Sequence, residues 1–324
     1  MNNYFNTLKQ CYIIAEIGVN YNGDMNLARE MIDAAKKAGA DAVKFQTFTA
    51  ESLVSAGTPK VKYQENTTSP EESHYEMIRN LEFKRDDHKC LLEYCEKVKV
   101  DFLSTPYDVD SAQFLTELGV EMFKTASADL VDIPLQQYIA NTKKPSIVSV
   151  GMASLGEVEA VAHLYRKAGN PHLILLHCVS NYPCSDNSLN LNVMKTLEQA
   201  FQLPVGYSDH SIGNEAAILS IAFGANVIEK HFTTDKQLSG PDHKASSSPE
   251  EFANLVKSVR RAEGMLGNPI KHCQLEEKQM SQVSRKSIVL GQNIQAGEVF
   301  TMEHLSLKRP GTGLGSNYLQ WFVG

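Results

Sequence analysis

Two histidines of the sequence each end a short apolar run. His210 closes VGYSDH (205–210) and His231 closes NVIEKH (226–231). If these runs are neighbouring strands about 4.8 Å apart, both imidazoles can reach one divalent metal ion. Two protein ligands leave coordination positions for water and substrate oxygens, as a Lewis-acid ion requires. The first hypothesis is therefore a metal site, and its alternative is a pair of hydrogen-bonded core histidines.

Lysines and hydroxyls form a second group with a shared chemistry. They lie at or just after other apolar runs: Lys44, Thr105, Lys124, Ser127, Ser149, Ser180 and Ser208. Two cations and many small donors around one cavity suit a phosphate or a carboxylate. A strand-end lysine also serves as a Schiff-base nucleophile in aldolases, which is a different mechanism for the same arrangement. Lys230 alternates with Glu229 and His231, so we expect it to point away from them.

Three carboxylates, Glu16, Glu229 and Asp242, are candidates for acid or base chemistry. A surface or salt-bridge role is equally open for each of them taken alone. Arg309 in KRPGTG is separated from the other candidates by the start of a different sequence pattern, so a structural role is the simpler hypothesis for it. The sequence contains no G-x-G-x-x-G or Walker motif, so neither nicotinamide nor nucleotide binding is indicated.

Eight apolar runs, most of them followed by a segment with helical spacing, must position these side chains. The predicted strands are Cys11–Val19, Asp41–Phe48, Asp101–Tyr107, Met122–Ser127, Pro145–Gly151, Leu173–Val179, Pro204–His210 and Asn226–Phe232. The predicted helices include Asn26–Ala38, Asp110–Leu118, Ser154–Ala168, Leu191–Ala200, Asn214–Phe223 and Pro249–Gly264. This alternation predicts an α/β fold with a covered parallel sheet, and the count is that of a (β/α)8 TIM barrel. A doubly wound open sheet is the alternative.

In a TIM barrel the active site lies at the carboxyl ends of the strands. The candidate side chains concentrate there, and inward-pointing polar groups are costly unless they are partnered, so packing alone explains them poorly. We therefore expect a site at the barrel mouth. A longer connection, from about Ala50 to Glu76, is predicted to be a lid or a surface excursion on the same side.

The pattern changes after residue 274, where short β-like runs separated by glycines replace the alternation. We therefore predict two domains, 1–274 and 275–324. About 50 residues are marginal for an independent core, so the small domain is expected to lean on the barrel or on another subunit.

Composition excludes several classes of function. The net charge of -7 argues against nucleic-acid binding, which needs clustered Lys and Arg. No run approaches the ~20 apolar residues of a membrane span and MNNYFNTLKQ lacks a secretory pattern, so we expect a cytoplasmic protein without a membrane partner. The six cysteines show no C-x-x-C spacing, so neither a zinc knuckle nor a redox pair is indicated.

Spaced motifs also carry a family resemblance: AEIGVNYNGD, VKFQTF, FLSTPYD, FKTASADL, VSVGMAS, LLHCVSNYP, VGYSDHS, EKHFT with SGPDH, and KRPGTG. From about residue 11 to the end, the chain resembles the sialic acid (N-acetylneuraminate) synthases, which condense phosphoenolpyruvate with an N-acetylated aminohexose such as N-acetylmannosamine. The resemblance implies a TIM barrel followed by an antifreeze-protein-like (SAF) domain. It also implies a domain-swapped homodimer, in which each small domain covers the partner's barrel mouth.

By matching motif, the resemblance implies roles for individual residues. Phosphoenolpyruvate would be held by Lys44, Thr105, Lys124, Ser127, Ser149, Ser180 and Ser208, with Asn181 adjacent to them. His210 and His231 would bind Mn²⁺, with Mg²⁺ or Co²⁺ as alternatives. Glu16 and Glu229 would line the catalytic site. The sugar would contact Gln46, Tyr182 and Asp242, and Arg309 would reach its acetamido group from the partner subunit.

Three positions depart from the family pattern. The motif K-x-x-S-x-E reads KTASAD, so the shorter Asp129 stands at the carboxylate position and the sugar preference stays open. Tyr21 replaces a frequent His, and the small domain is expected to be about one strand short at WFVG.

The alternatives to an N-acetylneuraminate synthase are a legionaminate or pseudaminate synthase using a diacetamido-trideoxyhexose, a Schiff-base aldolase, and a non-catalytic sugar-phosphate-binding module.

Overall fold

The computed structural model describes residues 2–55, 57–60 and 71–323. The chain divides into two compact units, Met1–Gly267 and Asn268–Gly324, and each is described by itself. Within the described ranges, no helix is both long enough and apolar enough to cross a membrane.

The first unit contains an eight-stranded parallel sheet. Its strands are β1 (Tyr12–Gly18), β2 (Ala42–Thr47), β3 (Asp101–Pro106), β4 (Phe123–Thr125), β5 (Ser146–Ser149), β6 (Leu173–His177), β7 (Val205–Asp209) and β8 (Ala225–His231). The hydrogen-bonded order is β3-β2-β1-β8-β7-β6-β5-β4. Strands β3 and β4 stand at the two ends of this order and yet contact each other, so the sheet closes on itself. The predicted (β/α)8 barrel is confirmed, and the doubly wound alternative is wrong.

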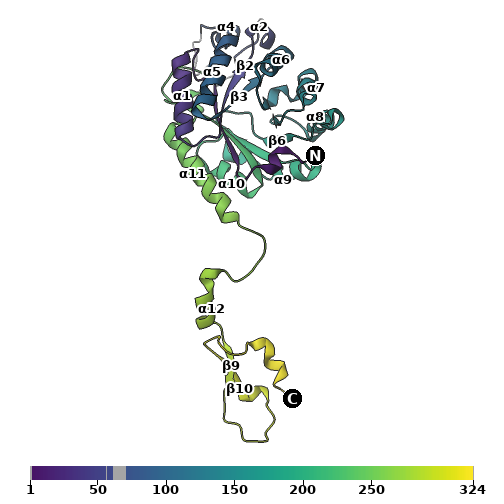
Figure 1. The fold of residues 1–324 in the computed structure, drawn as a ribbon, viewed down its shortest axis with the longest axis vertical. Helices are drawn as coiled ribbons and strands as arrows, with labels where there is room; N and C mark the ends of the chain where they lie inside the picture. Colours follow the sequence, from purple (N-terminus) through teal and green to yellow (C-terminus); the bar gives the residue numbers. More distant parts are fainter. Residues whose placement is uncertain (1, 56, 61–70, 324) are drawn as a thin grey trace. The chain divides into compact units, whose positions relative to one another are not determined.

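Helices surround the strands (Figure 1). They are α1 (Met25–Lys37), α5 (Arg85–Val98), α6 (Val109–Leu118), α7 (Ile133–Thr142), α8 (Leu155–Ala168), α9 (Val193–Phe201), α10 (Glu215–Ala222) and α11 (Pro249–Leu266). Helices α5 and α7 are not among the six helices named from the sequence. The first is rich in charged residues, and the second carries Pro134 in its first turn, where proline is tolerated.

The side chains that point into the barrel change from apolar to polar along the barrel axis. One apolar layer fills the barrel and includes Tyr12, Ile14, Ala42, Leu103, Met122, Ile147 and Val227. Because side chains on one face of a strand recur every second residue, the next inward positions toward the carboxyl ends are occupied by Glu16, Lys44, Thr105, Lys124, Ser149 and Glu229. The apolar layer therefore lies directly beneath a layer of polar side chains.

Several strands end earlier than predicted, which changes the backbone that carries some candidate residues. Strand β4 ends at Thr125, and Ser127 begins a 3₁₀ helix, η2 (Ser127–Val131). His210 follows the last residue of β7 instead of lying within the strand, and Ser180 lies in the loop after β6. These side chains thus belong to the loops that the strands position.

The excursion after β2 contains two short helices, α2 (Ala50–Leu53) and α4 (His74–Asn80). The side chain of Thr49 caps α2, and Ser73 with Glu76 forms a capping box at α4. Residues 56 and 61–70 of the predicted Ala50–Glu76 segment lie outside the described residues.

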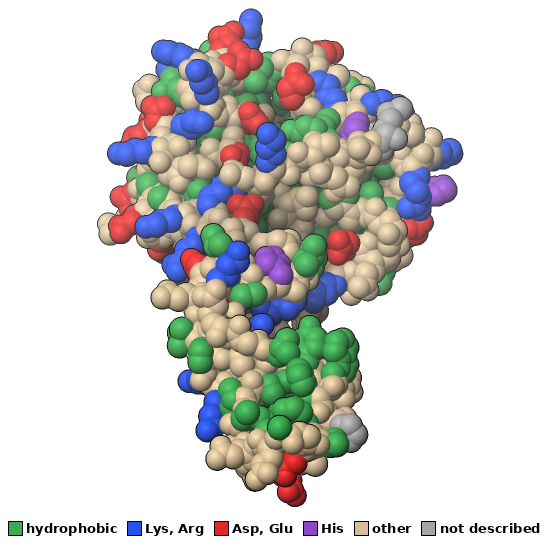
Figure 2. Space-filling view, turned by 60° about the horizontal axis from the view of Figure 1, so that its bottom comes forward, with side chains coloured by type: hydrophobic (Ala, Val, Ile, Leu, Met, Phe, Trp, Pro, Cys, Tyr) green, Lys and Arg blue, Asp and Glu red, His purple; other side chains and the backbone are tan. Residues whose placement is uncertain are grey.

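The second unit contains α12 (Lys278–Ser284), the antiparallel strands β9 (Ser287–Leu290) and β10 (Leu305–Lys308), and the 3₁₀ helix η7 (Ser316–Trp321). Figure 2 shows hydrophobic side chains gathered on its surface. The large apolar residues exposed in this unit include Leu290, Val299, Met302, Leu314, Trp321 and Phe322.

Candidate active site

A cavity of about 580 Å³ opens at the carboxyl ends of the barrel strands. Small-molecule sites span roughly 300–1,000 Å³, so this cavity is of the right size for one or two small substrates. Its lining includes fifteen of the candidate residues: Glu16, Lys44, Gln46, Thr105, Lys124, Ser127, Ser149, Ser180, Asn181, Tyr182, Ser208, His210, Glu229, His231 and Asp242. The structure therefore brings these side chains, from all eight strands or the loops after them, around one space.

Four buried charges of alternating sign form the floor of the cavity. Lys44 Nζ lies 2.6 Å from Glu16 Oε2 and 3.9 Å from Glu229 Oε2. Lys124 Nζ lies 3.7 Å from Glu229 Oε1. All four side chains belong to residues that are at most 5% exposed. Glu229 therefore links the two lysines, and the four formal charges sum to zero.

Burial and these neighbours shift the four pKa values in different directions. Burial raises the pKa of Glu229, but Lys124 and Lys44 outweigh this effect and hold that pKa at about 2. Burial raises the pKa of Glu16, with Lys44 opposing the rise. The pKa of Lys44 is raised because Glu16 and Glu229 outweigh its burial, whereas burial lowers the pKa of Lys124. Glu229 is therefore the fixed anion of the cluster.

Hydroxyl groups surround the lysines. Lys44 Nζ donates to Thr105 Oγ1 at 3.0 Å, and Lys124 Nζ donates to Ser149 Oγ at 2.7 Å. Ser208 Oγ donates to Glu229 Oε1 at 3.1 Å. The lysines thus present their charge together with small donors, as binding of a phosphate or carboxylate requires.

Gly151 allows two further serines to approach each other. Its amide donates to Ser127 Oγ at 3.0 Å. A Cβ atom at this position would lie 2.6 Å from Ser180 Oγ and 2.9 Å from Ser127 Oγ, closer than real contacts allow. The absent side chain keeps both hydroxyls at the cavity wall, a role of glycine that was not predicted from the sequence.

The two candidate histidines lie side by side, with their ring centroids 5.8 Å apart. His210 Nδ1 donates to the carbonyl oxygen of Val179 at 2.7 Å, which leaves Nε2 as the nitrogen able to bind a metal. His231 Nδ1 is buried and has no hydrogen-bond partner. Burial lowers the pKa of both rings, and the pKa of His231 falls to about 3, so both rings are neutral near pH 7.

This pair fits a divalent ion with an open coordination sphere. His231 has a buried nitrogen without a hydrogen-bond partner, and the neutral ring of His210 is oriented by a carbonyl oxygen. Both features are typical of metal-binding histidines. Within the described part of the chain, no group of three or more His, Cys, Asp or Glu residues could hold a metal ion. Two imidazoles leave further coordination positions open to water or substrate oxygens.

Comparison with known proteins adds an independent observation. The model of the NeuB family matches residues 31–271 of the chain. The chain belongs to the NeuB family. The predicted resemblance to phosphoenolpyruvate-condensing nonulosonate synthases is confirmed by this family and by relatives that are named as synthases of N,N'-diacetyllegionaminic acid and N-acetylneuraminate 9-phosphate.

Two relatives and one solved structure illustrate this likeness. The N,N'-diacetyllegionaminic acid synthase of Legionella pneumophila is 45% identical over 318 residues, covering 97% of this chain and 89% of the relative. Human N-acetylneuraminate-9-phosphate synthase is 36% identical over 299 residues, covering 92% and 83%. The structure of the N-acetylneuraminic acid synthetase of Leptospira borgpetersenii in complex with citrate superposes with a TM-score of 0.76 at 37% identity, covering 84% and 90%. This NeuB-family chain is an enzyme of the synthase type.

Asp129 is not among the residues of this NeuB-family chain that line the cavity, which belongs to the first compact unit. Asp129 lies in η2, next to the cavity-lining Ala128, and its Oδ2 atom is buried without a hydrogen bond. Burial raises its pKa to about 7, and Asp132 adds to the rise. Arg309 follows β10 in the second compact unit. Their predicted contacts with the sugar therefore stay predictions.

One side of the cavity was not predicted from the sequence. It consists of six apolar residues and the aromatic ring of a tyrosine: Val19, Phe48, Leu53, Met77, Ile78, Leu81 and Tyr107. These residues come from the ends of β1, β2 and β3 and from helices α2 and α4, so only the fold brings them together. The capping-box pattern at Ser73 and Glu76 was a signal that could have located α4, although not its place beside the cavity.

Proposed function

We propose that the chain is a nonulosonic acid synthase. It condenses phosphoenolpyruvate with an open-chain N-acetylated aminohexose and water, and it releases a nine-carbon 2-keto acid and phosphate. The observation that supports this most is the single cavity in which two buried lysines, a set of serine and threonine hydroxyls and two neutral histidines meet. N-acetylmannosamine and diacetamido-trideoxyhexoses are the candidate sugars.

Lys44, Lys124 and the surrounding hydroxyls bind phosphoenolpyruvate in this proposal. Glu16 and Glu229 form ion pairs with the two ammonium groups. Binding of the anionic substrate adds charge-assisted hydrogen bonds from the lysines and from Ser127, Ser149 and Ser180. Because the cavity floor is buried, these fixed donors hold the enol carbon in place without solvent reorganisation.

His210 and His231 are the residues that would hold a divalent ion, with Mn²⁺ proposed and Mg²⁺ or Co²⁺ as alternatives. When bound, such an ion supplies Lewis-acid polarisation of the aldehyde oxygen. Overall, a bond forms between C3 of phosphoenolpyruvate and the aldehyde carbon, water adds at C2, and the C–O bond to phosphate breaks. Glu16 and Asp242 line the cavity with raised pKa values, so they are able to exchange the protons that these steps require.

The remaining assignments rest on the resemblance. Gln46, Tyr182, Asp242 and Asp129 contact the sugar, and Asn181 lies adjacent to the phosphoenolpyruvate site. Residues 275–324 form a SAF domain that completes the partner's cavity in a homodimer, with Arg309 of each subunit reaching the acetamido group in the other. The enzyme acts in the cytoplasm, without nucleic acid or a membrane as partner.

The experiment is a phosphate-release assay with phosphoenolpyruvate and either N-acetylmannosamine or a 2,4-diacetamido-2,4,6-trideoxyhexose, followed by mass analysis of the product. We expect sugar-dependent release with Mn²⁺, none with EDTA, and a nine-carbon keto acid. Borohydride trapping of a pyruvate adduct, with activity that resists EDTA, would support the Schiff-base alternative instead. Binding of phosphoenolpyruvate without any phosphate release would support a non-catalytic module.

A further inference from the structure

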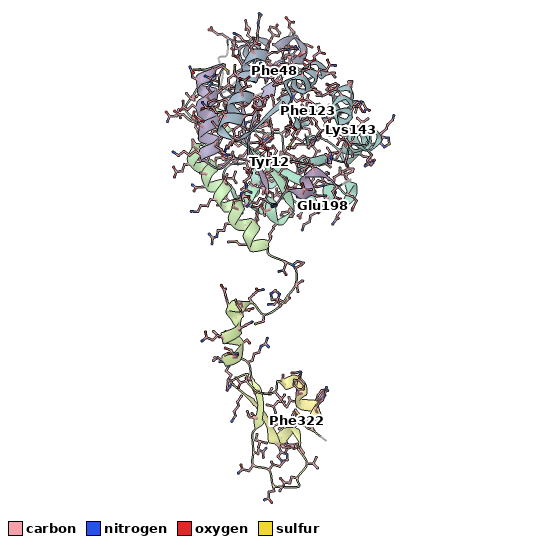
Figure 3. All side chains as sticks on the ribbon, in the orientation of Figure 1. Tyr12, Phe48, Phe123, Lys143, Glu198 and Phe322 are labelled. Atoms are coloured by element: carbon pink, nitrogen blue, oxygen red, sulfur yellow. The ribbon has the colours of Figure 1, made fainter. Side chains whose placement is uncertain are left out.

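The cavity has two chemically different sides. The buried lysines, hydroxyls and histidines form one of them. The other, which we call the apolar wall, consists of Val19, Phe48, Leu53, Met77, Ile78, Leu81 and Tyr107. Phe48, which is labelled in Figure 3, packs in one hydrophobic cluster with Leu53 of α2 and Met77 of α4.

The apolar wall is distinct from the cores that hold the barrel together. It forms a hydrophobic cluster of its own, separate from the layer inside the barrel and from the larger layer between strands and helices. All seven members of this cluster line the cavity. The cluster therefore forms part of the cavity surface in addition to packing the two short helices.

Hydrogen bonds fix the two short helices that carry much of this wall. The amide of Ala50 donates to Glu82 Oε2 at 3.1 Å, and Ser52 Oγ donates to Asp108 Oδ2 at 2.6 Å. Tyr21 Oη donates to the carbonyl oxygen of Leu81 at 3.0 Å. These bonds tie α2 and the end of α4 to the barrel, so the wall is a preformed surface.

An apolar surface of this size does not suit the hydroxyl-rich end of an ordinary hexose. A sugar hydroxyl placed against it would lose its hydrogen bonds to water and gain none from Phe48, Met77 or Leu81. A methyl group in the same place would be transferred out of water and stabilised. The wall therefore matches a sugar that carries methyl groups where common hexoses carry hydroxyls.

We infer that the apolar wall selects a 6-deoxy, diacetamido aminohexose over N-acetylmannosamine, and that Met77, Leu81 and Phe48 are specificity-determining residues. This inference rests on the proposed function, because it concerns the second substrate of that same reaction. A 2,4-diacetamido-2,4,6-trideoxyhexose presents a C6 methyl and an additional acetamido methyl, whereas N-acetylmannosamine presents hydroxyls at both positions. The name of the Legionella relative, an N,N'-diacetyllegionaminic acid synthase, agrees with this class of sugar.

The test compares kcat/KM for the two sugars in the full-length enzyme with saturating phosphoenolpyruvate. An apolar pocket rejects an added hydroxyl only moderately, so we expect a preference of about 10- to 100-fold for the diacetamido sugar. Met77→Gln changes polarity with little change in shape and should reduce this preference at least about fivefold, mainly through slower use of the diacetamido sugar. Met122→Gln is the matched control, because Met122 is 5% exposed against 3% for Met77 and lies in the layer inside the barrel.

The outcomes separate this inference from the proposed function. Sugar-dependent phosphate release with equal or better use of N-acetylmannosamine would overturn the inference and leave the synthase assignment intact. An unchanged preference in a folded Met77→Gln enzyme would also overturn the role of the wall. Failure to release phosphate with either sugar would contradict the proposed function itself, and the inference would fall with it. If Met77→Gln does not fold, Leu53→Thr gives the same comparison. Its control is Val54→Thr, at the neighbouring position, which does not line the cavity.

Discussion

Asp209 and Lys230 form a buried ion pair, with Asp209 Oδ2 2.6 Å from Lys230 Nζ, and each immediately precedes one of the two cavity histidines. Lys230 Nζ also donates to the carbonyl oxygen of Ser211, and Asp209 Oδ1 accepts from the Ser211 amide. The pair therefore ties the ends of β7 and β8 together at the point where His210 and His231 begin. Lys230 points away from its neighbours, as the alternation along the strand predicted.

Removing one member of this ion pair should destabilise the folded chain. In Lys230→Met the carboxylate of Asp209 stays buried without its cation, so we expect the free energy of unfolding to fall by about 3–5 kcal/mol. Denaturant titration measures this loss. The double variant Asp209→Asn with Lys230→Met should recover much of it, because no uncompensated charge remains. A single variant within about 1 kcal/mol of the wild type would contradict the argument.

Lys124→Met should weaken the binding of phosphoenolpyruvate. Loss of a charge-assisted hydrogen bond costs about 1.5–3 kcal/mol, which corresponds to roughly 10- to 100-fold in the dissociation constant. Calorimetric titration of phosphoenolpyruvate into the folded variant measures the change. Lys89→Met, at an exposed position of α5, serves as the control and should bind normally. An unchanged affinity in Lys124→Met would remove this lysine from the substrate site.

His231→Ala should lower the affinity for Mn²⁺. Since it removes one of the two histidines proposed as ligands, the loss should exceed the roughly 10- to 100-fold typical of outer-shell partners. Titration calorimetry of Mn²⁺ alone reports this without any enzyme assay, and turnover should disappear in parallel. His163→Ala, on the exposed face of α8, is the control. Wild-type Mn²⁺ affinity in His231→Ala would refute the metal site.

Asp242 should make stability depend on pH. Burial, and then Glu16, raise its pKa from 3.8 to about 7. The folded chain thus keeps a proton that the unfolded chain loses, so the stability this group contributes is present below about pH 4 and is lost as the pH rises through 7. Asp242→Asn should therefore be stabilising at pH 8, by roughly 2 kcal/mol after allowing for partial exposure, and neutral at pH 4.

Thermal unfolding of this variant at both pH values checks the sign. Asp110→Asn, at an exposed position of α6, should show no such difference between the two pH values. A stabilisation of Asp242→Asn that is equal at pH 4 and pH 8 would disprove the pH argument.

Arg309→Ala should weaken use of the sugar while phosphoenolpyruvate still binds. We expect KM for the sugar to rise about tenfold or more, because a charged donor to the acetamido group is lost. Mixing this variant with the His231→Ala variant, which should have no turnover, tests whether the arginine acts from the partner subunit. Restored activity in the mixed dimers supports exchange between subunits, and a loss of phosphoenolpyruvate affinity in Arg309→Ala alone would contradict the assignment.

The sequence allowed the barrel and the polar half of the site to be predicted for one physical reason. Parallel strands leave a strong apolar signal, and inward positions near their carboxyl ends interrupt it with residues such as Lys44, Lys124 and Glu229. The pairing of these charges was not predictable, because it depends on which strands are neighbours after closure. Ser127 was predicted at the end of a strand, but it lies in η2. The three-residue strand β4 was predicted too long because small and apolar residues continue after it.

The apolar wall escaped prediction for a different reason. Val19, Phe48 and Leu81 lie far apart in sequence and have no periodicity that relates them. Apolar side chains around short helices are ordinarily assigned to packing, and only their common access to the cavity reveals another use. Features that depend on distant segments meeting around a space are therefore the ones that required the structure.

The closure of the sheet has a consequence for the order of folding. Glu229 on β8 pairs with Lys44 on β2 and with Lys124 on β4, and β4 stands at one end of the hydrogen-bonded order whereas β2 is next to the other end. A half-assembled barrel can bury much of its hydrophobic surface before these strands meet, but it cannot assemble the cluster. Chains of this length commonly pass through such intermediates. The full set of charged and hydroxyl donors therefore surrounds one space only in the closed barrel. Phosphoenolpyruvate that binds there would stabilise the closed barrel over partly folded chains by mass action.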